Sequence, residues 1–213
     1  MKLFLASMNV DIGLQSAFFA LVGKEAKDIK FALIENAADP YPSAQRSFVL
    51  ATRQAFKALG VQVTLLDLRY YQDNQERLYA KLKDFDVVWL GGGNTYYLRW
   101  LLRVTGFENI IATLLNNGLT YGGGSAGAIV VCPVLDEFDR VDSIELAPEP
   151  IYQGLNLVDF VILPHWQDPE YQSELVKIKA HYEKKTEYLA ITIEDGQAVV
   201  VNGETWDIYP KSI

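Results

Sequence analysis

Short apolar runs alternate along this chain with longer segments in which apolar residues recur at helical spacing. The alternation is typical of βα units, in which helices cover both faces of a mostly parallel sheet. Each short run is nearly all apolar, as expected of a strand buried on both sides. We therefore predict an α/β fold of three layers, α/β/α, with strands at residues 2–7, 29–35, 62–66, 87–90 and 119–121.

The segments between these strands predict helices that cross over the sheet. Ser43 is placed to cap a helix that runs to Leu59 and ends at Gly60. Residues 72–82 and 95–103 predict two further helices.

The regular alternation of apolar runs and helical segments ends after residue 125. Pro133, Pro148 and Pro150 interrupt an acidic segment that has no helical period, and this pattern predicts a long surface loop. A strand, a polar helix and a hairpin that turns at Asp195 and Gly196 are predicted beyond it, at residues 160–163, 169–184, and 188–193 with 197–201. Neither a repeat nor a linker is apparent, so we expect residues 1–213 to form a single catalytic domain.

Composition and charge limit the kinds of function and partner that the protein is expected to have. The 213 residues are 50% hydrophobic, enough for a sizeable core, and the formal net charge of −8 disfavours nucleic acid and anionic membrane surfaces as partners. The first ten residues lack a signal cleavage site, and charges interrupt every apolar run before it could span a membrane. The single cysteine, Cys132, excludes an internal disulfide and fits a reducing compartment, so we expect a cytoplasmic protein.

The most informative motif is GGSAG at residues 123–127, which satisfies GxSxG directly after an apolar strand. A nucleophile on a strand-to-helix turn needs small neighbours, because its side chain must stand clear of a strained backbone. The helix that follows aims amide groups, including that of Ala126, at an oxyanion. The motif therefore predicts Ser125 as a nucleophile, against the plain alternative of a tight glycine-rich turn.

A serine hydroxyl needs a base, and the chain has only two histidines. His165 follows the apolar run that ends in ILP, where a parallel sheet would place it at the same carboxyl edge as Ser125. His181 lies in a polar helical stretch and is expected to face solvent. His165 is therefore the predicted base.

The third member of a triad is a carboxylate that orients the imidazole. The loop between Ser125 and His165 holds several acidic residues, and their spacing does not choose among them: Asp136, Glu137, Asp139, Asp142 and Glu145.

A second glycine cluster, GGGNT at residues 91–95, also ends a strand and opens a helix. It lacks the lysine of a phosphate-binding loop and the spacing of a dinucleotide fingerprint. The N–H of Gly92 or Gly93 could instead supply a second oxyanion donor beside Ala126. Asn94 and Thr95 are able to cap the helix, and we also predict them at the substrate site.

Three ordered motifs resemble a known family. GGGNT at 91–95, GGSAGA at 123–128 and LNLVDFVILPHW at 155–166 are similar to the serine peptidases that include peptidase E, an aspartyl dipeptidase, and cyanophycinase. The resemblance implies a flavodoxin-like fold, as in the class I glutamine amidotransferases, with serine in place of their elbow cysteine. It implies Ser125 as nucleophile, His165 as base, and Gly93 with Ala126 as the oxyanion hole.

For the acid, the resemblance favours Asp142, with Asp139 in reserve. Peptidase E carries arginines after its histidine that are associated with an acidic substrate residue, and this chain has none there. Lys177 or Lys179 could replace that charge, but lysine does not reproduce the bidentate grip of arginine on a carboxylate.

These observations predict a serine peptidase that acts on short peptides as a dipeptidase and uses no cofactor or metal, as a monomer or homodimer. Two alternatives remain. An α/β-hydrolase esterase shares GxSxG, although the 40 residues between Ser125 and His165 leave little room for its further βα units. A binding or regulatory protein could keep this fold without turnover.

Overall fold

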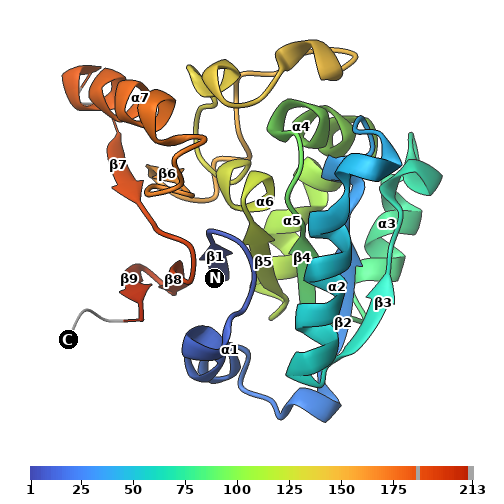
Figure 1. Ribbon diagram of the computed structural model, residues 1–213. Coiled ribbons are helices and arrows are strands. Elements are labelled where there is room, and N and C mark those ends of the chain that lie inside the picture. Colours follow the sequence, from blue (N-terminus) through green and yellow to red (C-terminus); the bar gives the residue numbers. More distant parts are fainter. Residues whose placement is uncertain (186–187, 211–213) are drawn as a thin grey trace.

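The computed structural model describes residues 1–185 and 188–210 and is built around a seven-stranded mixed sheet (Figure 1). The strand order is β3-β2-β4-β5-β1-β8-β9. The first five strands in this order run parallel, whereas β8 and β9 are antiparallel to their neighbours. The strands are β1 Lys2–Ala6, β2 Lys30–Ile34, β3 Gln62–Leu65, β4 Val87–Leu90, β5 Thr120–Gly124, β8 Ala198–Asn202 and β9 Thr205–Tyr209.

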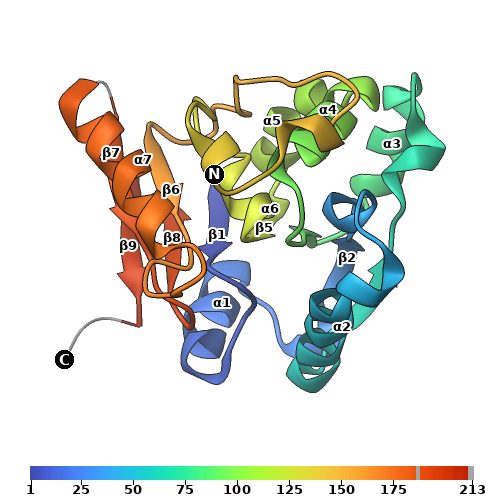
Figure 2. The same ribbon diagram turned by 45° about the horizontal axis from the view of Figure 1, so that its top comes forward.

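Helices cover both faces of the sheet (Figures 1 and 2). One face packs against α1 and α2, and the other against α3 to α6. The three-layer α/β/α class predicted from the sequence is confirmed. The helices are α1 Gln15–Val22, α2 Ser47–Leu59, α3 Gln75–Leu82, α4 Thr95–Val104, α5 Phe107–Asn116, α6 Ala126–Ile129 and α7 Gln172–Lys185.

The central strand β1 shows why its residues are nearly all apolar. Leu3 and Leu5 belong to the hydrophobic cluster on the α3 to α6 side, whereas Phe4 and Ala6 belong to the cluster under α1 and α2. Successive side chains of a strand point to opposite faces, so a strand between two helical layers buries every position. All four of these side chains are fully buried.

The C-terminal strands pair differently from the predicted hairpin, which was wrong. Strand β7 (Leu189–Thr192) pairs in parallel with β6 (Phe160–Leu163) in a separate two-stranded sheet. Strand β8 instead joins the main sheet beside β1 and forms the actual hairpin with β9, which the sequence analysis did not predict. The short segment with Asp195 therefore connects two sheets.

Other predicted elements shift by a few residues. The helix expected from Ser43 begins as a 3₁₀ turn at Ser43–Gln45, and α2 itself starts at Ser47 without a side-chain cap. Gly60 ends α2, as predicted, and its φ of 83° lies in the left-handed region that glycine tolerates. Helices α1 and α5 were not predicted.

The segment from Pro133 to Pro150 is not a surface loop throughout. It contains 3₁₀ turns at Phe138–Arg140 and Ile144–Leu146, and the side chains of Leu135 and Phe138 are fully buried. Burial of these side chains ties the segment to the core.

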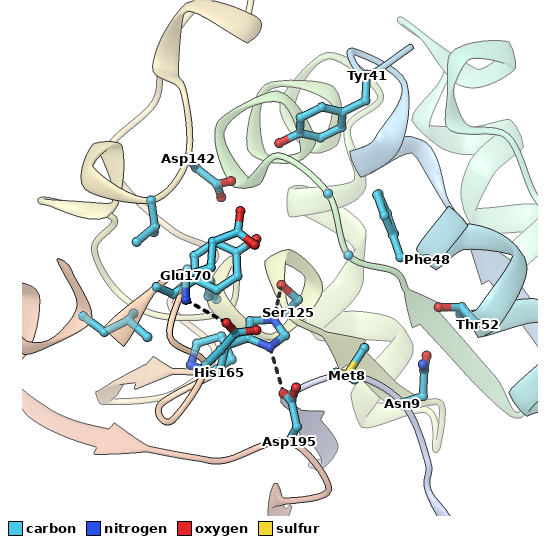
Figure 3. A pocket seen from close by; sticks show the side chains of 18 of the residues that line it. Met8, Asn9, Tyr41, Phe48, Thr52, Ser125, Asp142, His165, Glu170 and Asp195 are labelled. Carbon is cyan, nitrogen blue, oxygen red and sulfur yellow. Dashed lines mark hydrogen bonds and ion pairs between the residues drawn. The ribbon is translucent and has the colours of Figure 1, made fainter. Parts of the chain in front are cut away.

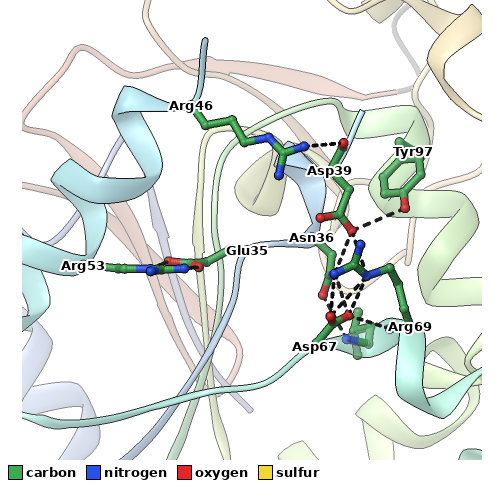
Figure 4. A network of polar contacts seen from close by, with 9 residues as sticks. Glu35, Asn36, Asp39, Arg46, Arg53, Asp67, Arg69 and Tyr97 are labelled. Carbon is green, nitrogen blue, oxygen red and sulfur yellow. Dashed lines mark hydrogen bonds and ion pairs between the residues drawn. The ribbon is translucent and has the colours of Figure 1, made fainter. Parts of the chain in front are cut away.

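A polar network ties down the segment that follows β2 (Figure 4). Asn36 donates from Nδ2 to Asp39 and Asp67, and Arg69 forms an ion pair with Asp67 at 2.6 Å. Arg46 donates to the carbonyl oxygens of Tyr41 and Asp39. These contacts hold the stretch from 36 to 46 in place above the carboxyl end of the sheet.

In the part of the chain described by the structure, no helix is both long and apolar enough to cross a membrane.

Candidate active site

Ser125 stands on a sharp turn between β5 and α6. Its φ of 51° and ψ of −115° lie in a region that residues with a side chain rarely adopt. The preceding Gly124 has no room for a side chain, because a Cβ there would lie 1.9 Å from the carbonyl oxygen of Met8. The Ser125 N–H donates to the carbonyl oxygen of Ala6 at 3.2 Å, which anchors the turn to β1. The strained backbone therefore presents the Ser125 hydroxyl beyond the end of β5.

His165 meets Ser125 from the end of β6. Its Nε2 lies 3.0 Å from the Ser125 Oγ, within hydrogen-bond distance. The His165 backbone also has a positive φ, of 57°, and its N–H donates to the Ser7 Oγ at 2.9 Å. The two residues that sequence analysis predicted as nucleophile and base are thus brought into contact.

Asp195 contacts the other side of the imidazole (Figure 3). Its Oδ1 lies 2.8 Å from His165 Nδ1 and accepts a hydrogen bond from the Ser7 Oγ at 2.6 Å. A proton on Nδ1 that is donated to Asp195 leaves Nε2 free to accept from the Ser125 hydroxyl. The four side chains form one chain of hydrogen bonds: Ser125, His165, Asp195 and Ser7.

Strand pairing explains why these residues meet. In the β6–β7 register Leu163 faces Thr192, so His165 and Asp195 follow their strands at the same edge. In the main sheet Ala6 pairs with both Gly124 and Ala198, which places Ser7 between the two neighbouring strands. The carboxyl ends of parallel strands are where open α/β sheets gather functional groups.

Asp142 does not take the place predicted for it. Its Oδ2 accepts a hydrogen bond from the Thr95 N–H at 2.9 Å, at the start of α4. The carboxylate at His165 Nδ1 is that of Asp195, and among the described residues neither Asp142 nor the reserve Asp139 forms a hydrogen bond with the imidazole. The loop from 133 to 150 packs Asp142 over the α4 N-terminus, whereas β7 leads Asp195 to His165.

The turn after β4 approaches Ser125. A Cβ on Gly92 would lie 3.3 Å from the Ser125 Cβ, so the turn after β4 lies against the nucleophile. Gly93 has a φ of 144°, and a Cβ there would lie 2.2 Å from the Ala37 backbone. Within residues 1–185 and 188–210, the N–H groups of Gly93 and Ala126 have no hydrogen-bond acceptor. Both are therefore free to donate to a ligand.

Asn94 and Thr95 lie beneath this turn rather than in the cavity wall. Both are fully buried. The Asn94 side chain caps α4 by accepting from the Tyr97 N–H, and it donates to the Ser143 carbonyl oxygen. We therefore leave both residues out of the proposed substrate site, since their contacts hold α4 and the following loop together.

A cavity of about 450 Å³ opens over the Ser125–His165 pair. Its apolar wall comes from side chains such as Tyr41, Phe48 and Ile129, and its charged wall from Asp142, Asp168, Glu170 and Asp195. No group of three or more histidine, cysteine, aspartate or glutamate side chains in the described part of the chain is placed to hold a metal ion. The site can thus perform acyl transfer by a serine nucleophile with a histidine base.

Comparison with known proteins identifies the family. The model of peptidase family S51 matches residues 13–209. The chain belongs to peptidase family S51. This S51 peptidase is 31% identical over 206 residues to an uncharacterized peptidase of Pasteurella multocida, with 96% of this chain and 95% of the other covered. It is 30% identical over 172 residues to a peptidase E of a Nostoc species, covering 78% of this chain and 65% of the relative.

Solved structures agree with this assignment. A peptidase E-like protein from Listeria monocytogenes matches with a TM-score of 0.83 at 27% sequence identity, over 99% of this chain and 98% of the other. Membership of family S51, together with these relatives, makes the protein a serine-type peptidase.

Sequence reasoning missed two side chains at the site of this S51 peptidase. The sequence predicts Asp195 in a hairpin turn and Ser7 as the last residue of a strand. The available signal was a polar residue shortly after a strand, since Ser7 directly follows β1 and Asp195 lies three residues after β7, at the functional edge of the sheet. The other histidine, His181, lies on α7 and approaches Glu137 instead of the Ser125–His165 pair.

The Asp142 carboxyl makes the stability of this S51 peptidase depend on pH. Burial raises its pKa to about 6, although hydrogen bonds from Thr95 and the nearby His165 act in the opposite direction. Folding therefore favours the protonated carboxyl. The resulting stability is present below the ordinary pKa of 3.8 and is lost as the pH rises through 6.

Between pH 4 and pH 8, we expect the free energy of unfolding of Asp142→Asn to rise by about 1–2 kcal/mol relative to that of wild type. This is less than the free energy that corresponds to the full shift in pKa, because the cavity admits water to the carboxyl. Urea unfolding at both pH values measures this gain. The exposed Asp139→Asn serves as the control and is expected to show no such change. A difference between Asp142→Asn and wild type that stays the same at both pH values would contradict the prediction.

Proposed function

We propose that this S51 peptidase hydrolyses short peptides as a dipeptidase through Ser125, His165 and Asp195. One observation carries the proposal: the Ser125 Oγ, the His165 imidazole and the Asp195 carboxylate are joined by contacts of 3.0 and 2.8 Å at the floor of the cavity. A serine nucleophile, a base and an orienting acid in this order are the geometric signature of acyl-transfer catalysis.

In the first half of the reaction, the Ser125 Oγ attacks the peptide carbonyl carbon while His165 Nε2 takes the hydroxyl proton. The carbonyl oxygen becomes an oxyanion, and the free N–H groups of Gly93 and Ala126 donate to it. The imidazolium then gives its proton to the leaving amine as the C–N bond breaks. Asp195 stabilises the imidazolium and keeps the Nδ1 proton facing away from Ser125.

In the second half, a water molecule replaces the leaving amine. His165 takes a proton from the water as the water oxygen attacks the acyl carbon. The imidazolium then returns that proton to the Ser125 Oγ as the bond from Oγ to the acyl carbon breaks and the acid is released. Ser7 holds this arrangement from behind, since it donates to Asp195 and accepts from the His165 N–H. We regard Ser7 as a positioning residue.

The size of the cavity and the named relatives support a short substrate. About 450 Å³ is in the range that encloses a small ligand. A relative from Drosophila melanogaster, 31% identical over 144 residues, is named a probable alpha-aspartyl dipeptidase. A long polypeptide would need an open groove, whereas a dipeptide fits a cavity of this size.

Labelling with a fluorophosphonate probe tests the proposal directly. We expect an adduct on Ser125, located by mass spectrometry, because His165 activates its hydroxyl. His165→Ala should slow labelling by about 10³-fold or more, since the base is lost. Ser173→Ala, which removes an exposed hydroxyl on α7, is the matched control and should label like wild type.

Circular dichroism would confirm that each variant is folded. An adduct on a residue other than Ser125, or labelling that does not depend on His165, would refute the proposed nucleophile and base. Hydrolysis of a dipeptide mixture by the same preparations then checks the class of substrate.

A further inference from the structure

The charged groups that line the active-site cavity are all acidic. Apart from His165, the ionic side chains in its wall are Asp142, Asp168, Glu170 and Asp195. Within the described part of the chain, neither lysine nor arginine lines the cavity. An acidic substrate side chain in this cavity would therefore be repelled.

The lysine and arginine side chains discussed so far form their contacts outside the cavity. Lys177 and Lys179, which sequence analysis considered as partners for an acidic substrate, form ion pairs with Glu174 and Glu183 on α7. The arginines around the stretch from 36 to 46 are held in the separate network of Figure 4, where Arg46 donates to backbone carbonyl oxygens and Arg69 pairs with Asp67. The cavity thus keeps its negative charge.

Three of the four carboxylates are not used by the Ser125–His165 pair. Asp195 Oδ1 contacts both His165 and Ser7, whereas Asp168 uses Oδ1 for the Glu170 N–H and keeps Oδ2. Asp142 uses Oδ2 for the Thr95 N–H, which leaves Oδ1, and the side chain of Glu170 forms neither an ion pair nor a hydrogen bond among the described residues. Figure 3 shows Asp142 and Glu170 around the Ser125–His165 pair, from the loops before and after β6.

Tyr171 also lines the cavity, close to these carboxylates. Burial raises the pKa of its phenol, and the charges of Glu170, Asp142, Asp168 and Asp195 raise it further. The same region has an apolar wall that includes Tyr41 and Phe48. An aliphatic stem can lie along such a wall while its ammonium or guanidinium group meets the carboxylates.

We propose that this cavity selects peptides whose first residue carries a positively charged side chain, lysine or arginine, with Glu170 and Asp142 as its counter-charges. The inference rests on the proposed function, because it names the residue whose carbonyl Ser125 attacks. It departs from the aspartate preference that the family resemblance implies. The absence of a metal-binding cluster among the described residues favours an organic cation over a metal ion as the occupant.

Three dipeptides isolate the effect of side-chain charge: Lys-Ala, norleucyl-Ala and Asp-Ala. They share the free amino terminus and the leaving alanine, and the first two have side chains of similar length. We expect kcat/KM to fall by about 10-fold from Lys-Ala to norleucyl-Ala and again to Asp-Ala, the size of one screened charge interaction. A flat series, or Asp-Ala as the best substrate, would overturn the proposal.

Variants assign the selectivity to named carboxylates. Glu170→Gln and Asp142→Asn should each lower the Lys-Ala to norleucyl-Ala ratio by about 5-fold, and Glu170→Lys should favour Asp-Ala over Lys-Ala. Glu149→Gln removes a charge on the exposed loop outside the cavity and should keep the wild-type ratio. Ratios unchanged in both Glu170→Gln and Asp142→Asn would exclude these residues as the counter-charges.

Binding to Ser125→Ala separates this proposal from the proposed function. Calorimetry with this variant measures the Kd of the same three dipeptides without turnover, and Lys-Ala should bind about 10-fold more tightly than norleucyl-Ala. If wild type hydrolyses none of them and Ser125 stays unlabelled, the proposed function fails while the Kd values still decide the charge preference. If Ser125 is labelled and Kd is independent of charge, only the charge preference fails.

Discussion

Replacing Ser125 by alanine is expected to reduce kcat/KM for dipeptides by about 10⁴-fold or more, the loss typical of removing a serine nucleophile. The physical reason is that the hydroxyl of the neighbouring Ser7 cannot take its place. The neighbouring Ser7 Oγ is buried, and its hydrogen bonds to Asp195 and the His165 N–H hold it behind the imidazole. Initial-rate measurements on a purified variant, with mass-spectrometric exclusion of wild-type contamination, give the result.

Stability measurements show whether the loss of activity is chemical or structural. Ser125 has a φ of 51°, where a side chain is strained, so Ser125→Gly should be more stable than Ser125→Ala by about 1 kcal/mol while being equally inactive. Ser173→Ala should retain wild-type rates. A Ser125→Ala protein that keeps more than about a tenth of the wild-type activity would rule out Ser125 as the nucleophile.

Replacing Asp195 by asparagine is expected to lower kcat by about 10³- to 10⁴-fold with a smaller change in KM. Asp195 Oδ1 lies 2.8 Å from His165 Nδ1, and an amide there can donate to Nδ1 instead of accepting from it. The proton would then sit on Nε2, which could no longer accept the Ser125 hydroxyl proton. The developing imidazolium would also lose its counter-charge.

The rate of fluorophosphonate labelling provides a second readout for Asp195, because the probe needs an activated Ser125 but little of the substrate site. It should fall in Asp195→Asn and remain normal in Asp139→Asn, a control that removes an exposed charge from the loop before β6. The rate of labelling in these variants distinguishes the two candidate orienting acids, Asp195 and Asp142. Loss of labelling in Asp142→Asn, with normal labelling in Asp195→Asn, would restore Asp142 as the orienting acid.

Together the two predictions test a site whose parts come from five strand ends. Ser7, Gly93, Ser125, His165 and Asp195 follow β1, β4, β5, β6 and β7. Each is placed by the strand before it, so the precision of the site depends on the strand registers rather than on the loops. The positive φ of both Ser125 and His165 shows that the surrounding packing holds these residues in backbone conformations they would not adopt alone.

Local sequence signals were enough to predict the parallel strands of this protein and two of the residues at its candidate site. Buried strands are apolar whatever their partners, so the five parallel strands were predicted to within about three residues of their actual ends. The pairing of Ser125 with His165 was predicted because small residues surround Ser125 as an elbow requires, and because His165 is the histidine that follows a buried strand. Both signals depend on neighbours in the chain.

The choice of strand partners was decided only by the tertiary structure. Whether β7 pairs with β8 or with β6 depends on the packing of the whole chain, and the residues between β7 and β8 are equally compatible with a hairpin turn. The contact of Ser7 with His165 spans 158 positions, and that of Asp195 with His165 spans 30. No local pattern encodes contacts at such separations, so the acid beside His165 and the charge of the cavity emerged only when the strands were paired.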